Sequence, residues 1–122
     1  MEELEMYHGA ITKAQAEKIL GAAGRDGSFL LRDSETVPGT YCICVLSDQH
    51  VFTYRVYQVE GNVWKMETDP GVKARLFRNV RNLLAVYENP NQGIAIPLRF
   101  PVRHSQAQSC RPQPLPRNPT PQ

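Results

Sequence analysis

An arginine stands at the end of an apolar run, and a loop of hydroxyl and acidic residues follows it. The run covers residues 28–32 and ends at Arg32, and the loop opens with Asp33, Ser34 and Glu35. A guanidinium presents a planar fork of donors that matches phosphate oxygens, and each charge-assisted hydrogen bond contributes about 1.5–3 kcal/mol. Arg32 is therefore a candidate ligand for a phosphorylated side chain. The alternative is an internal ion pair with Asp33, Glu35 or Glu67.

Other side chains would lie beside Arg32 if the strands that follow pair with one another. Because side chains alternate along a strand, Thr53 and Arg55 project together and Tyr54 projects to the other face. In an antiparallel meander, Arg32, Cys42 and Arg55 can then lie on the same face of the sheet.

The loop and the helix before it offer further donors. Lys13 opens a predicted helix and could bring its ammonium group and the positive helix end toward the same anion. Ser34, Thr36 and the amides of residues 34–39 would complete the pocket. The alternative is that Lys13 and Arg55 are ordinary solvated residues.

Local signals predict the elements that would hold these side chains. Thr12 and Gln15 have capping-box spacing before a helix over 13–23, and Asn79 caps a second helix that Pro90 ends. Strands are predicted at 28–32, 41–46 and 51–57, with a short hairpin strand within 61–68 and a final edge strand at 94–96. The strands are almost continuously apolar, so each face of the sheet needs a helix to cover it. We therefore expect an α+β fold in which two helices flank a central antiparallel sheet.

Composition fits one domain with a tail. The chain has 122 residues, of which 41% are hydrophobic and 21% charged, and no apolar run approaches the about 18 residues that a membrane span needs. We expect the domain to occupy residues 1–102 and a disordered tail rich in Pro, Ser and Gln to occupy 103–122. A net charge of +2 permits an anionic ligand without requiring nucleic acid or membrane as partner. We expect a monomer.

The cysteines and the acidic start indicate a reducing compartment. Residues 1–5 lack the basic and apolar character of a secretory signal, so we expect a cytoplasmic protein. The three cysteines are odd in number. Cys42 and Cys44 are expected to point to opposite faces of their strand, which makes a disulfide between them implausible.

Enzymatic and metal-dependent functions find little support. A cysteine-dependent phosphatase needs an arginine six positions after its thiolate, and here those positions hold Asp48, His50 and Pro116. A glycine-rich phosphate loop is also missing. Because Cys42 and Cys44 are expected to diverge, they would not converge on a metal ion. We predict no catalytic residue, no metal site and no cofactor.

Two other patterns indicate binding only weakly. Lys73, Arg75, Arg78 and Arg81 form a basic series, but only Phe77 among them could stack on a base, so a solvated helix face explains the series as well as nucleic acid does. The tail contains a PxxP core at 116–119, but the cation that usually flanks such ligands is missing.

Taken together, four segments resemble the Src-homology-2 (SH2) family in order and spacing. They are residues 7–9, 26–35, 54–56 and 91–94. Within that family the chain is similar to the small free-standing SAP (SLAM-associated protein) adaptors, because residues 31–39 and 70–72 match their pattern. The departures are Lys13, which stands where arginine is common, the tip at 47–50, which lacks an expected aromatic residue, and the tail.

The resemblance implies a non-catalytic adaptor that binds tyrosine motifs of the TxYxxV/I type in the cytoplasmic tails of SLAM-family immune receptors. It implies two groups of binding residues. Phosphotyrosine would be held by Arg32, Lys13, Ser34, Glu35, Thr36, Cys42 and Arg55. A specificity groove for an apolar residue three positions later would be lined by Val51, Thr53, Tyr54, Gly93 and Ile94. The alternative is a regulator that only blocks other adaptors.

A kinase contact is also implied by the resemblance. Arg78 matches the position through which SAP contacts the SH3 domain of a Fyn-type kinase, by a surface distinct from a PxxP ligand. We therefore expect this SH3 domain as a second partner.

Overall fold

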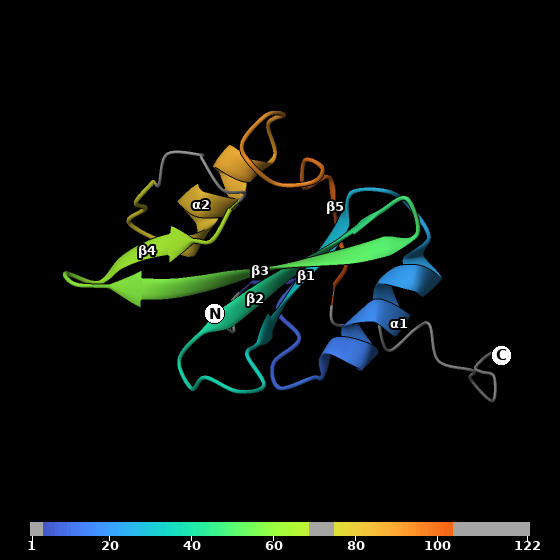
Figure 1. Ribbon diagram of the computed structural model, residues 1–122, viewed down its shortest axis with the longest axis horizontal. Coiled ribbons are helices and arrows are strands. Elements are labelled where there is room, and N and C mark those ends of the chain that lie inside the picture. Colours follow the sequence, from blue (N-terminus) through green and yellow to red (C-terminus); the bar gives the residue numbers. More distant parts are fainter. Residues whose placement is uncertain (1–3, 69–74, 104–122) are drawn as a thin grey trace, which may run out of the picture.

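A five-stranded sheet runs through the middle of the molecule (Figure 1). The computed structural model describes residues 4–68 and 75–103, so Lys73 and most of the predicted tail lie outside the described residues. The strands are β1 (Ser28–Asp33), β2 (Tyr41–Ser47), β3 (His50–Val59), β4 (Val63–Met66) and β5 (Phe100–Pro101), and their order in the sheet is β4-β3-β2-β1-β5. The first four form the antiparallel meander that the short connections predict.

The last strand differs from the prediction. Residues 94–96, expected as an edge strand, form bends, and the backbone N–H of Ala95 donates to the Tyr54 hydroxyl at 2.8 Å. The final strand is instead β5, which pairs in parallel with β1. The prediction of a strand at 94–96 is therefore wrong. The Tyr54 side chain binds the backbone of this segment, where hydrogen bonds to a neighbouring strand were expected.

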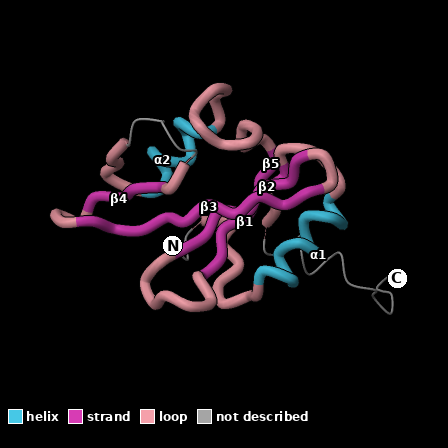
Figure 2. Tube along the Cα trace, viewed as in Figure 1, coloured by secondary structure: helices cyan, strands magenta, loops and turns pink. Residues whose placement is uncertain are grey.

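Two helices cover the two faces of the sheet, as predicted. α1 (Lys13–Ala23) begins after Thr12, which forms the capping box with Gln15, and it ends at Gly24 in the left-handed conformation. α2 (Val80–Tyr87) begins after Asn79, whose side chain accepts from the N–H of Asn82 at 2.9 Å. Figures 1 and 2 show the helices on opposite sides of the sheet. The expected α+β fold is confirmed.

The strands divide their side chains between two cores. The α2 side holds Leu31, Ile43, Val56 and others, and the α1 side holds Leu30, Cys42 and Cys44 among its buried residues. The expectation that Cys42 and Cys44 point to opposite faces is therefore wrong. Residues i and i+2 of a strand share a face, and β2 is a regular strand. Both thiols are free.

Within the described ranges, no helix is long and apolar enough to cross a membrane. In those ranges there is also no group of three or more His, Cys, Asp or Glu side chains that could hold a metal ion.

Candidate functional site

Arg32 is buried on the α1 side of β1, with 4% of its surface exposed. One guanidinium nitrogen, Nη1, donates to the carbonyl of Asp33 at 3.1 Å. Among the described residues, the buried Nε has no hydrogen-bond partner. The carboxylate of the adjacent Asp33 accepts from the Tyr7 hydroxyl. Within the described part of the chain, no carboxylate forms an ion pair with Arg32, so a buried cation retains donor capacity for a ligand.

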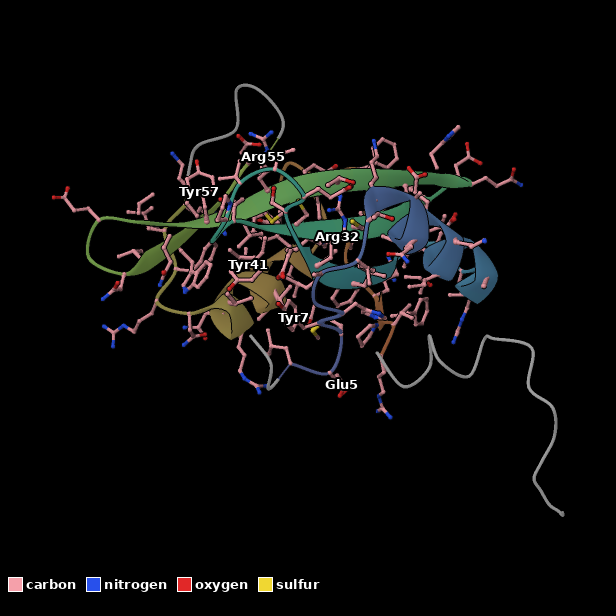
Figure 3. The ribbon with its side chains drawn as sticks, turned by 90° about the horizontal axis from the view of Figure 1, so that it is seen from below. Glu5, Tyr7, Arg32, Tyr41, Arg55 and Tyr57 are labelled. Carbon is pink, nitrogen blue, oxygen red and sulfur yellow. The ribbon has the colours of Figure 1, made fainter. Side chains whose placement is uncertain are left out.

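The sheet register brings the predicted partners to Arg32. Arg32 lies opposite Cys42, and Cys42 lies opposite Arg55, so the three form one row across β1, β2 and β3. Figure 3 shows the two arginines, with Arg32 near the start of α1 and Arg55 on β3. Arg55 is exposed whereas Arg32 is buried. The geometry thus supplies one deep and one superficial cation on the same face.

This row belongs to an open pocket of about 510 Å³, which we call the phosphate pocket after the ligand that the sequence analysis predicts for Arg32. Its lining combines two cations and two carboxylates with hydroxyl and thiol side chains from the sheet and the loop. These residues are Arg32, Ser34, Glu35, Thr36, Cys42, Thr53, Arg55 and Glu67. Six of the seven residues predicted to hold phosphate line it, and Lys13 does not.

The loop after β1 is shaped by Ser34. Its hydroxyl oxygen accepts from the backbone N–H of Thr36 at 3.3 Å and of Val37 at 3.1 Å, which is a local turn of the kind that serine favours. The turn places Ser34, Glu35 and Thr36 at the rim of the pocket. The hydroxyl protons of Ser34 and Thr36 can donate to an anion there.

Lys13 meets the pocket only through its backbone. Its side chain is exposed, and its N–H donates to Glu35 Oε2 at 2.8 Å. The positive end of α1 is therefore engaged by the Glu35 carboxylate, whereas the sequence analysis considered that this end could face a ligand directly.

The thiols beneath α1 are neutral at ordinary pH. Burial raises the pKa of Cys42, and the Arg32 charge opposes this shift. Burial also raises the pKa of Cys44, whose sulfur lies 3.7 Å from the Thr53 hydroxyl. Uncharged thiols leave the positive charge of Arg32 available to another anion.

The residues predicted for the specificity groove do not all lie together. Tyr54 and Ile94 pack on the α2 side, and Gly93 precedes Ile94 with a φ of +91°. Val51 packs against the α1-side core, and Thr53 lines the phosphate pocket. The structure thus groups Tyr54, Gly93 and Ile94 on one face and places Val51 and Thr53 on the other.

The edge of β3 connects these two faces. β4 pairs with β3 only from Val56 to Val59, and β2 pairs with the other edge of β3 from His50 to Val56. Among the described strands, none pairs with the outer edge of residues 50–55, and only the Arg55 carbonyl at the end of this stretch is bonded, by the N–H of Glu67. A segment lying across this open edge reaches the phosphate pocket on one side and Tyr54 and Ile94 on the other.

Glu67 is a pocket residue that the sequence analysis considered only as an internal partner for Arg32. It follows β4, and its N–H donates to the Arg55 carbonyl at 2.9 Å, which places it beside Arg55. The register of the β3–β4 hairpin, in which Val56 faces Met66, would have predicted this position had the turn been located within 61–68.

Arg78 is exposed and lies just before the Asn79 cap of α2. Arg75 also precedes the helix, and Arg81 lies on it, so the described part of the basic series is not one helix face as the sequence suggested.

Comparison with known proteins supports a binding domain. A family model described as SH2 domain matches residues 6–87. The SH2 domain-containing protein 1B2 of Mus musculus is 37% identical over 103 residues, covering 84% of this chain and 78% of the relative. Together these two similarities support a phosphotyrosine-binding adaptor.

Larger relatives share only this domain. Phosphatidylinositol 3,4,5-trisphosphate 5-phosphatase 2B of Danio rerio is 44% identical over 102 residues, and the human 5-phosphatase 2 is 44% identical over 96 residues. The alignments cover 83% and 79% of this chain but 8% of each phosphatase. The similarity therefore concerns the SH2 part and carries no argument for phosphatase activity.

Proposed function

The chain belongs to the SH2 domain family, and on that premise we propose that it is a non-catalytic adaptor for tyrosine motifs of the TxYxxV/I type in the tails of SLAM-family receptors. The observation that carries the proposal is the buried Arg32, whose Nε has no hydrogen-bond partner among the described residues and which lines the phosphate pocket. A phosphate entering there gains charge-assisted hydrogen bonds that the protein itself does not satisfy.

The open edge of β3 supports an extended peptide as the ligand. Phosphotyrosine would occupy the pocket on the α1 side, and the peptide would cross β3 to place an apolar side chain against Tyr54 and Ile94. Charge pairing would supply affinity for the phosphate, and apolar burial at about 25 cal/mol per Å² would select the residue three positions later.

Replacement of Arg32 tests the proposal. We expect Arg32→Ala to weaken binding of a phosphorylated TxYxxV peptide by about 100-fold, because the bidentate contacts of one guanidinium are lost. Calorimetric titration of the full chain measures this loss. Arg81→Ala, which removes an exposed arginine on α2, serves as the matched control and should bind as the wild type does. Equal affinity of the Arg32→Ala and wild-type chains would contradict the proposal.

We further propose that the chain recruits a Fyn-type kinase through Arg78. Support comes from the exposure of Arg78 and of Leu76, a cation and an apolar side chain that lie two residues apart in the chain. The alternative function, a regulator that blocks other SH2 proteins, needs no such surface.

We expect Arg78→Ala to lower retention of the Fyn SH3 domain in a pull-down by about tenfold, with peptide binding unchanged. Arg81→Ala again controls for the loss of one positive charge. If Arg78→Ala and Arg81→Ala retain equal amounts of the SH3 domain, the blocking function is the better description.

A further inference from the structure

Four charged side chains line the phosphate pocket, and their formal charges cancel. Arg32 and Arg55 are positive, and Glu35 and Glu67 are negative. A pocket for a dianion gains affinity from positive charge, and each carboxylate near the phosphate opposes that gain. The two glutamates therefore affect how much more tightly the pocket binds a phosphorylated tyrosine than an unphosphorylated one.

The two carboxylates have different surroundings. Glu35 accepts the Lys13 N–H at 2.8 Å and lies at the positive end of α1, so its charge is partly compensated. Within residues 4–68 and 75–103, no donor forms a hydrogen bond with the Glu67 side chain. Only its backbone is held, through the N–H bond to the Arg55 carbonyl at 2.9 Å. Glu67 thus places a negative charge, with no hydrogen bond from a described residue to its carboxylate, on the pocket wall that carries Arg55.

We propose that Glu67 is a specificity-determining residue that reduces the preference of the pocket for phosphorylated over unphosphorylated tyrosine. The inference rests on the proposed function. Repulsion from Glu67 acts on the phosphate dianion and not on a neutral phenol, so it lowers the affinity of one ligand form and spares the other.

A different role for Glu67 predicts the opposite result. If its carboxylate served to orient Arg55 toward the phosphate, removal of the charge would release Arg55 and weaken the binding of the phosphorylated peptide. The sign of the change therefore separates an opposing charge from a positioning one.

The test uses Glu67→Gln in the full chain and a synthetic TxYxxV peptide in its phosphorylated and unphosphorylated forms. We expect Glu67→Gln to bind the phosphorylated peptide about threefold to tenfold more tightly in calorimetric titration, with the unphosphorylated peptide unchanged. The gain should shrink when salt is raised from about 0.05 M to about 0.5 M, because exposed charges are screened. Unchanged or weaker binding of the phosphorylated peptide overturns the proposal.

Two further variants complete the design. Glu60→Gln makes the same change of charge at an exposed position in the β3–β4 turn, and it should alter both affinities by less than about twofold. Arg32→Ala tests the pocket itself. If Arg32→Ala abolishes the preference for phosphate and Glu67→Gln has no effect, only the role of Glu67 is wrong. If Arg32→Ala keeps the preference, the proposed phosphate pocket is wrong and the inference fails with it.

Discussion

At the scale of single residues, burial sets the protonation of the two thiols under α1. Arg32 and Arg55 would both favour a Cys42 thiolate, yet desolvation is the larger effect and raises the pKa of Cys42. Cys44 is buried more deeply, and its pKa is raised for the same reason despite the nearby Arg32. A cation that lies beside two neutral thiols keeps its attraction for anions from outside the protein.

These shifts predict a loss of stability at alkaline pH. The unfolded chain ionises a cysteine thiol near pH 9.0, whereas burial raises the pKa of Cys44 in the folded chain, which holds the proton to higher pH. The folded state then binds more protons, so the free energy of unfolding falls as the pH rises above the pKa of the unfolded thiol. Urea unfolding should show a larger loss between about pH 8 and about pH 10 for the wild type than for Cys44→Ala. Equal losses in the two proteins would refute this explanation.

At the scale of elements, Gly27 lies just before β1 and forms backbone hydrogen bonds both with β2 and with the start of β5. Its N–H donates to the Leu46 carbonyl at 2.8 Å, and its own carbonyl accepts from the N–H groups of Arg99 and Phe100. Its φ is +91°, and an added Cβ would lie 2.8 Å from the Cβ of Arg99. Because Cβ is fixed to the backbone, Arg99 cannot relieve this contact by a simple rotation of its side chain.

We therefore expect Gly27→Ala to lower the free energy of unfolding by about 1–3 kcal/mol, through backbone strain and the close contact with Arg99. Denaturant unfolding measures the change. Gly21→Ala is the matched control, because Gly21 lies within α1 and an added Cβ there meets no atom within 4 Å. That variant should be about 0.5–1 kcal/mol more stable than the wild type. A stability of Gly27→Ala equal to that of the wild type would contradict the role of Gly27.

Elements with local signals were predictable, and those that depend on distant pairing were not. Thr12, Gly24 and Asn79 mark the helix ends by capping, which needs only neighbouring residues. β5 is two residues long and includes Pro101, and it pairs with a strand about 70 residues earlier in the chain. No local sequence pattern therefore predicts it. Conversely, residues 94–96 have strand-like composition but are held by Tyr54.

The same distinction applies to the candidate site. The row of Arg32, Cys42 and Arg55 followed from strand alternation once the meander was assumed. The place of Glu67 required the hairpin register, and the direction of the Lys13 side chain depends on rotamers that sequence does not fix. Cys42 and Cys44 share a face, contrary to the expectation, because positions two apart in a strand point to the same side and β2 keeps that period.

At the scale of the whole molecule, β1 is the meeting point of both described ends of the chain. The Leu31 N–H donates to the Met6 carbonyl, and the Val102 N–H donates to the Phe29 carbonyl at 2.8 Å. The ring of His8 also bonds to the Val102 carbonyl at 2.8 Å, and Arg103 pairs with Glu5 at 2.8 Å. Entry and exit of the polypeptide thus lie next to each other.

A unit whose entry and exit points are neighbours can be spliced into a larger polypeptide with little disturbance to the host, since it interrupts the host chain at a single point. In the 5-phosphatases, the region that matches this chain is 8% of the length, so a similar unit occurs within a much longer polypeptide. For protein engineering, the same closeness favours fusing reporters at either terminus or grafting the unit into a surface loop of another scaffold.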